Sequence, residues 1–284
     1  MKIKILDSKL VLKFIVPTML FVLVISCNPK NNLSSFNYGT QHDSARYHYL
    51  RGFHEILDNG RWTESEKSFR KAVELDPGYT LGKSLVGRIT RNLEERKRIQ
   101  QELLAEHFEN GDEKLLLDVY LLSIEAYNSR EEGITLTPEF RSKRKRIAES
   151  NFREFVRKYP NDDYVKAEYI EWLHLIHGPE TALDSLQYLA TERQKKLGFY
   201  ISFAASLELE LGRIDNAIRL SEDLKDLMKD STYTAYTKLK AEIFMAQDSL
   251  QKAKDYIDEV VRIDPNHLIA VSIQSEIHKR LKSE

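Results

Sequence analysis

The sequence contains one cysteine among 284 residues, so no disulfide can form within the chain and its stability must come from packing. It has no G-x-S-x-G stretch and no cysteine placed as a nucleophile, and its acidic residues are spaced as on solvated helix faces. No apolar run reaches the ~20 residues of a membrane-spanning helix. The 43 basic and 44 acidic residues nearly balance, which argues against a general nucleic-acid binder.

The N-terminus combines positive charge with a short apolar run. Residues 14–25 are almost entirely apolar, and the run ends in Ser26 and Cys27. It follows four lysines: Lys2, Lys4, Lys9 and Lys13. This pattern resembles a bacterial lipoprotein signal peptide, in which the chain is cut before the cysteine and acyl chains are attached to it. An uncleaved N-terminal anchor is the alternative, and both readings tether an exported chain to a membrane.

The sequence predicts three parts along the chain. Residues 1–26 are expected to be the signal peptide, residues 27–42 the lipidated Cys27 with a flexible polar tether, and residues 43–284 the folded body. Removing residues 1–26 takes four lysines and Asp7, which leaves 39 basic and 43 acidic residues. No acidic run follows Cys27, which favours a lipid-anchored protein of the outer membrane that faces the periplasm.

The body is predicted to be all-α, because apolar residues recur with the period of a helix. Phe203, Leu207 and Leu211 follow this spacing, as do the apolar residues between 115 and 124. The prolines of this part fall where helical runs start or stop (Pro77, Pro138, Pro160, Pro179 and Pro265). About a dozen helices are expected, and only residues 133–138 indicate an extended stretch.

Two segments resemble the tetratricopeptide repeat, a helix-turn-helix unit of 34 residues. The first unit carries its pattern at Tyr49, Ile56, Gly60, Trp62, Phe69, Ala72, Leu75, Asp76 and Pro77. The last full unit carries it at Ala241, Phe244, Ala253, Ile257, Val260, Ile263, Asp264 and Pro265. The resemblance implies a right-handed superhelical solenoid over residues 43–284, with residues 92–150 irregular.

Solenoids of this family bind proteins or peptides along a concave groove lined by the first helix of each unit. The resemblance therefore implies a membrane-anchored adaptor or scaffold of the cell envelope, with an unidentified protein partner, no cofactor, no metal and no catalysis. About half of the aligned groove positions are expected to pack between repeats. These positions are Tyr47, Leu50, His54, Leu57, Arg88, Arg91, Glu168, Trp172, Phe199, Ser202, Lys238 and Glu242.

A narrower hypothesis comes from the turn at residues 155–167. Its pattern of Phe155, Tyr159-Pro160-Asn161, Tyr164 and Ala167 is similar to the inter-repeat turn of envelope repeat proteins. One of these is the lipoprotein of the outer-membrane β-barrel assembly machine. The similarity implies a component of outer-membrane protein assembly as an alternative function.

Two other features offer different chemistry. His174 and His177 lie one helical turn apart, with Glu171 one turn earlier, so a metal- or ligand-binding site or an enzyme is a further alternative. No second Glu-x-x-His is present to complete a di-metal carboxylate site. The basic run of residues 141–146 is expected either to be a solvated helix face or to dock onto anionic lipid or an acidic partner.

Overall fold

The computed structural model describes residues 36–106 and 111–283, and these residues form helices and turns without a strand. The α-helices are α1 (Asp43–Phe53), α2 (Trp62–Leu75), α3 (Thr80–Ile89), α4 (Leu93–Ala105), α5 (Asp112–Glu131), α6 (Pro138–Lys158), α7 (Tyr164–His177), α8 (Pro179–Leu189), α9 (Gly198–Glu210), α10 (Ile214–Lys225), α11 (Ala235–Ala246), α12 (Leu250–Ile263) and α13 (Leu268–Ser283). A π-helical turn, η1 (His54–Asp58), follows α1, and a 3₁₀ turn, η2 (Gln194–Lys196), precedes α9. The all-α prediction is confirmed, and residues 133–137 are a turn and coil between α5 and α6.

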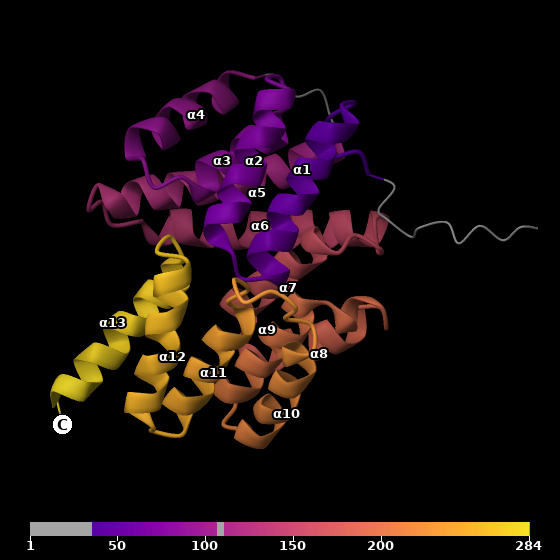
Figure 1. The fold of residues 1–284 in the computed structure, drawn as a ribbon. Helices are drawn as coiled ribbons and strands as arrows, with labels where there is room; N and C mark the ends of the chain where they lie inside the picture. The colour runs from indigo at the N-terminus through magenta and orange to yellow at the C-terminus, as the bar shows by residue number, and fades with distance from the viewer. Residues whose placement is uncertain (1–35, 107–110, 284) are drawn as a thin grey trace, which may run out of the picture. The chain divides into compact units, whose positions relative to one another are not determined.

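Successive helices pack against one another in the order of the chain (Figure 1). The pairs α1/α2, α3/α4, α7/α8, α9/α10 and α11/α12 form helical hairpins, and α13 packs on α12. First helices of neighbouring units also touch, α3 on α5 and α9 on α11. This arrangement is an all-α solenoid of tetratricopeptide-like repeats. The irregular stretch predicted at residues 92–150 contains α5 and the first part of α6, which at 20 and 21 residues are the longest of the described helices.

Small residues set the close contact inside the first unit. Ala72 of α2 has no exposed surface, and Gly52 of α1 faces the ring of Phe69 on α2. A Cβ atom at position 52 would lie 2.3 Å from that ring, well inside van der Waals contact. Gly52 stands where the repeat pattern usually has leucine, and the structure explains the departure because only glycine lets these helices approach this closely.

The apolar core continues from unit to unit. One cluster of buried side chains extends from residue 36 to α7, and three further clusters join α7 to α10, α9 to α11, and α11 to α13. Each unit therefore covers the apolar face of its neighbour, as expected for a solenoid.

The folded body begins before α1. Phe36 and Tyr38 are 8% and 3% exposed, and the Phe36 ring lies 5.0 Å from that of Phe155 on α6. Residues 36–42, which the sequence pattern assigned to the tether, thus pack on the body because they carry two aromatic side chains that it buries. The predicted signal peptide 1–26, Cys27 and residues 28–35 lie outside the described residues.

The turn of the first unit, residues 54–63, also contacts the C-terminal units. Asp58 Oδ1 accepts a hydrogen bond from the backbone N–H of Phe199, at the start of α9, at 2.9 Å. The backbone carbonyl of Asn59 accepts from the N–H groups of Thr234 and Ala235, at the start of α11. The Trp62 ring stacks on His267, immediately before α13, with centroids 5.5 Å apart. The first unit is therefore bonded to units that follow it by more than 130 residues.

Candidate partner-binding site

The predicted groove residues differ widely in their exposure to solvent. The exposed ones are Tyr47, His54 and Arg91; the half-buried ones are Leu50, Leu57, Arg88, Ser202, Lys238 and Glu242; the buried ones are Glu168, Trp172 and Phe199. They therefore divide between positions that a partner can reach and positions that hold the repeats together.

Three of these residues are apolar packing positions. Leu50 packs against the first core cluster, Leu57 contacts the first and the second, and Phe199 is part of the second. The Phe199 ring stacks on Phe203, one turn further along α9, with centroids 5.2 Å apart. These side chains stabilise the packing of the helices that carry the polar groove residues.

Arg88 and Glu168 form an ion pair between α3 and α7. Nη1 of Arg88 lies 2.5 Å from Oε1 of Glu168, and the hydroxyl of Tyr120 on α5 donates to Oε2 at 2.6 Å. The guanidinium carbon of Arg88 is 4.5 Å from the centroid of the Tyr120 ring. Burial acts to lower the pKa of Arg88, but the Glu168 carboxylate outweighs it and raises this pKa above its usual value. Three helices are joined through these side chains.

A second arginine, Arg144, contacts an aromatic ring of α7 instead of a carboxylate. Arg144 of α6 places its guanidinium carbon 4.7 Å from the centroid of the Trp172 ring on α7, a cation–π contact. Burial, together with the positive charge of Arg88, lowers the pKa of Arg144. The basic run and the groove, treated as separate surfaces from the sequence, therefore meet at this contact.

Glu171 on α7 and the Lys238–Glu242 pair on α11 carry further charges. Glu171 reaches solvent but is enclosed by protein, and this burial together with the charge of Glu168 raises its pKa to about 7. The positive charges of Arg88 and Lys238 oppose this rise. Lys238 of α11 in turn pairs with Glu242 at 2.7 Å. Three predicted groove residues, Arg88 of α3, Glu168 of α7 and Lys238 of α11, therefore act on the charge of Glu171.

The remaining polar groove residues, Ser202, His54 and Arg91, each form a hydrogen bond to another residue of the protein. Ser202 donates to the carbonyl of Phe199 within α9. His54 Nδ1 lies 2.9 Å from Oδ2 of Asp58, and this hydrogen bond raises the pKa of His54. Arg91 donates to Oδ1 of Asn266, in the turn before α13, at 3.1 Å.

The two histidines of the metal-site hypothesis point to different partners. His174 Nε2 lies 2.9 Å from Glu210 on α9, whereas His177 Nε2 lies 3.3 Å from Glu149 on α6. Within residues 36–106 and 111–283, no group of three or more His, Cys, Asp or Glu side chains is arranged to hold a metal ion. The geometry gives the metal alternative no support.

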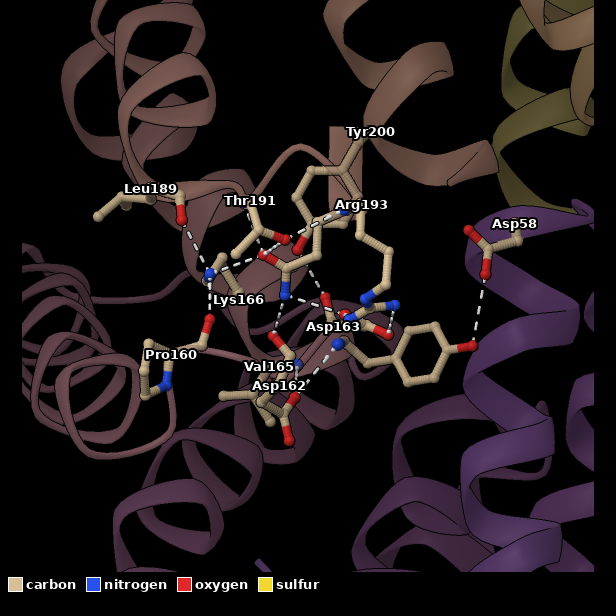
Figure 2. A network of polar contacts seen from close by, with 12 residues as sticks. Asp58, Pro160, Asp162, Asp163, Val165, Lys166, Leu189, Thr191, Arg193 and Tyr200 are labelled. Carbon is tan, nitrogen blue, oxygen red and sulfur yellow. Dashed lines mark hydrogen bonds and ion pairs between the residues drawn. The ribbon is translucent and has the colours of Figure 1, made fainter. Parts of the chain in front are cut away.

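The buried amine of Lys166 has three acceptors within the protein (Figure 2). Its Nζ donates to the carbonyls of Pro160 and Leu189, the latter at 2.8 Å, and to Oε1 of Gln194 at 2.7 Å. Burial lowers the pKa of Lys166 to about 8. All three donors of the ammonium are satisfied, so this network fastens the α6–α7 turn, the end of α8 and η2 together.

Two site residues escaped prediction from the sequence. Tyr120 has an ordinary position in a helical apolar stretch, and its bond to Glu168 depends on how α5 packs on α7. Arg144 was part of the basic run, but nothing local distinguishes it from Arg146 beside it. Glu171 was singled out only as a companion of the histidines. The periodicity of a helix could have placed Glu168 and Trp172 on one face of α7, since they are four residues apart.

None of the helices in residues 36–106 and 111–283 has the length and apolarity needed to cross a membrane.

Comparison with known proteins agrees with the repeat pattern. A search of curated proteins finds no significant match. Residues 239–267, within α11, α12 and the turn after them, match the tetratricopeptide repeat. This confirms the last of the predicted units, and such repeats generally serve in protein–protein interaction rather than in catalysis.

Proposed function

We propose that this chain is a lipid-anchored adaptor of the bacterial cell envelope that binds a protein partner through the inner face. Here the inner face means the polar side chains around α7 that the previous section brings together: Arg88, Arg144, Glu168, Glu171, Lys238 and Glu242. The observation that carries the proposal is the cluster of charged side chains from α3, α7 and α11, in which the Arg88–Glu168 ion pair and Lys238 both act on Glu171. A repeat known for protein binding supports it.

The anchor part of the proposal rests on Cys27 and the residues before it. Acylation requires the thiol, and two or more acyl chains give stable membrane attachment, whereas one gives only reversible binding. Cys27→Ser should therefore release the protein from membranes or leave its precursor uncleaved. Fractionation and mass spectrometry of the N-terminus check this. Wild-type protein that is soluble and carries no lipid mass contradicts the anchor.

The binding part is tested by affinity capture from detergent-solubilised membranes. Glu171→Lys adds positive charge at an inner-face position that reaches solvent, and should change partner capture strongly. Asp184→Lys on α8 makes the same charge change at an exposed position on a second helix and should leave capture intact. Both variants should keep the helical circular dichroism spectrum of the wild type, because exposed substitutions usually change stability by only ~0.5 kcal/mol. Equal capture by the two variants would place binding elsewhere.

The identity of the captured protein decides the narrower alternative. An outer-membrane β-barrel, or another component of its assembly machine, supports the role that the turn at residues 155–167 indicates. A partner from another pathway leaves the adaptor function standing and removes the assembly role.

A further inference from the structure

Arg144 carries a positive charge that no described carboxylate neutralises. Arg61, Arg88 and Arg96 each contact a carboxylate at 2.5 to 2.8 Å. Arg144 is half-buried, and no residue of 36–106 or 111–283 lies within hydrogen-bond or ion-pair distance of its guanidinium. Its Nε is shut off from solvent without an acceptor. A cation held in this way is costly unless a counter-charge arrives from outside the chain.

The contact with Trp172 fixes where that counter-charge can bind. The indole ring is 8% exposed and lies against the guanidinium, with 4.7 Å from its centroid to the guanidinium carbon. Because Nε is covered, the terminal amino groups of Arg144 are the donors that remain accessible. A planar guanidinium held against a rigid ring presents such donors to a planar acceptor with little loss of side-chain entropy.

Two carboxylates of α7 lie close to Trp172 in the sequence without neutralising Arg144. Glu168 lies one turn before Trp172 on the same face of α7, and Glu171 immediately precedes that tryptophan. Glu168 is paired with Arg88, and neither carboxylate forms a hydrogen bond or ion pair with Arg144. A planar carboxylate can accept from both terminal amino groups of Arg144 at once, so it is the anion whose geometry fits these donors. Arg88 is already engaged with Glu168 and its Nε is buried, so it supplies long-range attraction rather than a donor that an anion can reach.

We propose that Arg144, held on Trp172, is the subsite that receives the carboxylate of an aspartate or glutamate side chain in the bound partner. This inference rests on the proposed function, because it names the chemistry by which the inner face recognises a protein segment. The partner segment is therefore acidic at the residue that meets α6 and α7.

The test uses the full chain in detergent and a phage-displayed library of random dodecapeptides as the probe. The wild type should select peptides rich in aspartate or glutamate. The best peptide is then synthesised with each acid in turn replaced by its amide, and its Kd is measured by calorimetry. Arg144→Gln and one acid-to-amide exchange should each weaken binding at least about tenfold, as expected for a hydrogen bond to a charged group.

The decisive result is the coupling between the two changes. In the Arg144→Gln protein the same acid-to-amide exchange should have no further effect, because the partner of that acid is gone. Arg146→Gln, which removes an exposed arginine from the same helix, should change Kd by less than about twofold.

Three outcomes overturn the subsite. If the selected peptides lack acidic residues and bind the Arg144→Gln protein as tightly as they bind the wild-type protein, the subsite is excluded and the adaptor function is retained. A phosphoserine replacement that binds more tightly than the acid, and only when Arg144 is present, reassigns the subsite to phosphate. A wild-type chain that selects no peptide contradicts the proposed function together with the subsite.

Discussion

At the scale of single residues, His267 is held as a neutral ring. It is 2% exposed, and its Nδ1 accepts a hydrogen bond from the backbone N–H of Ala270 in the first turn of α13. Burial lowers the pKa of His267 to about 4, and the charge of Lys238 adds to this effect. Protonation would remove the acceptor and place a positive charge at the positive end of a helix. The ring therefore opposes protonation as long as the chain is folded.

The stability of the protein should consequently fall in mild acid. The unfolded chain binds a proton at His267 near pH 6.5, whereas the folded chain binds it only near pH 4, so this stability is present above pH 6.5 and lost as the pH falls to 4. Between pH 7 and pH 5 the loss from this group is about 2 kcal/mol. His267→Asn keeps a capping acceptor but cannot titrate, and urea unfolding at both pH values should show a smaller loss. Equal losses in the two proteins would contradict this.

The ion pair of Arg88 and Glu168 should be required for stability. Glu168 has a side chain only 5% exposed, so Arg88→Ala leaves a buried carboxylate without its cation. We expect about 3 kcal/mol of destabilisation in urea unfolding. Arg88→Ala in a Glu168→Gln background should cost much less, because the uncompensated charge is absent. Additive effects would show that the two side chains do not interact in solution.

The sequence did not predict how these two side chains pair. Repeat alignment placed Arg88 and Glu168 among the groove residues, and the structure shows that each neutralises the other. Their long side chains meet between α3 and α7, although the two residues lie 80 positions apart. Arg144 was missed for the same reason, since a helical wheel of α6 does not reveal that Trp172 lies beside it.

At the scale of helices, the geometry of the first unit depends on the close approach of α1 and α2 at Gly52. Gly52→Ala places a methyl group where the Phe69 ring now lies, 2.3 Å from the new Cβ. Although alanine favours helix, the overlap should dominate and destabilise the protein by about 1–3 kcal/mol. Phe69→Leu in the same chain should recover part of this loss by making room. Gly78→Ala, whose Cβ would meet nothing nearer than 3.5 Å, is the control and should be nearly neutral.

Helix positions were the most predictable part of the fold. Proline and glycine marked the boundaries because both act locally, through the missing N–H and the permitted backbone angles. Pro138 opens α6 behind the capping hydroxyl of Thr137, and Pro179 opens α8. The inclusion of Phe36 in the body was not predictable, because its segment has no periodicity and its burial depends on α6.

At the scale of the molecule, the first unit is bonded to the last. The N–H and hydroxyl of Thr63, at the start of α2, donate to the two carboxylate oxygens of Asp264 at 3.0 and 2.6 Å. Asn266 donates to the Thr63 hydroxyl at 3.0 Å. A repeat signature describes each unit and its neighbour only, so no local pattern in the sequence indicates this contact. In an ordinary solenoid the terminal helix is stabilised by one neighbour alone, and its opening is independent of the other end.

The contact should therefore make the last helix depend on the first unit. Thr63→Ala removes the hydroxyl bonds without opening a large cavity, and should speed hydrogen exchange in α13, about 200 residues away in sequence. Ser68→Ala is the matched control on α2, because its hydroxyl bonds only to the carbonyl of Glu64 within that helix. Mass spectrometry of proteolytic peptides reads both. If α13 exchanges at the same rate in Thr63→Ala, Ser68→Ala and the wild type, the two ends unfold independently and the contact contributes nothing to holding the C-terminal unit in place.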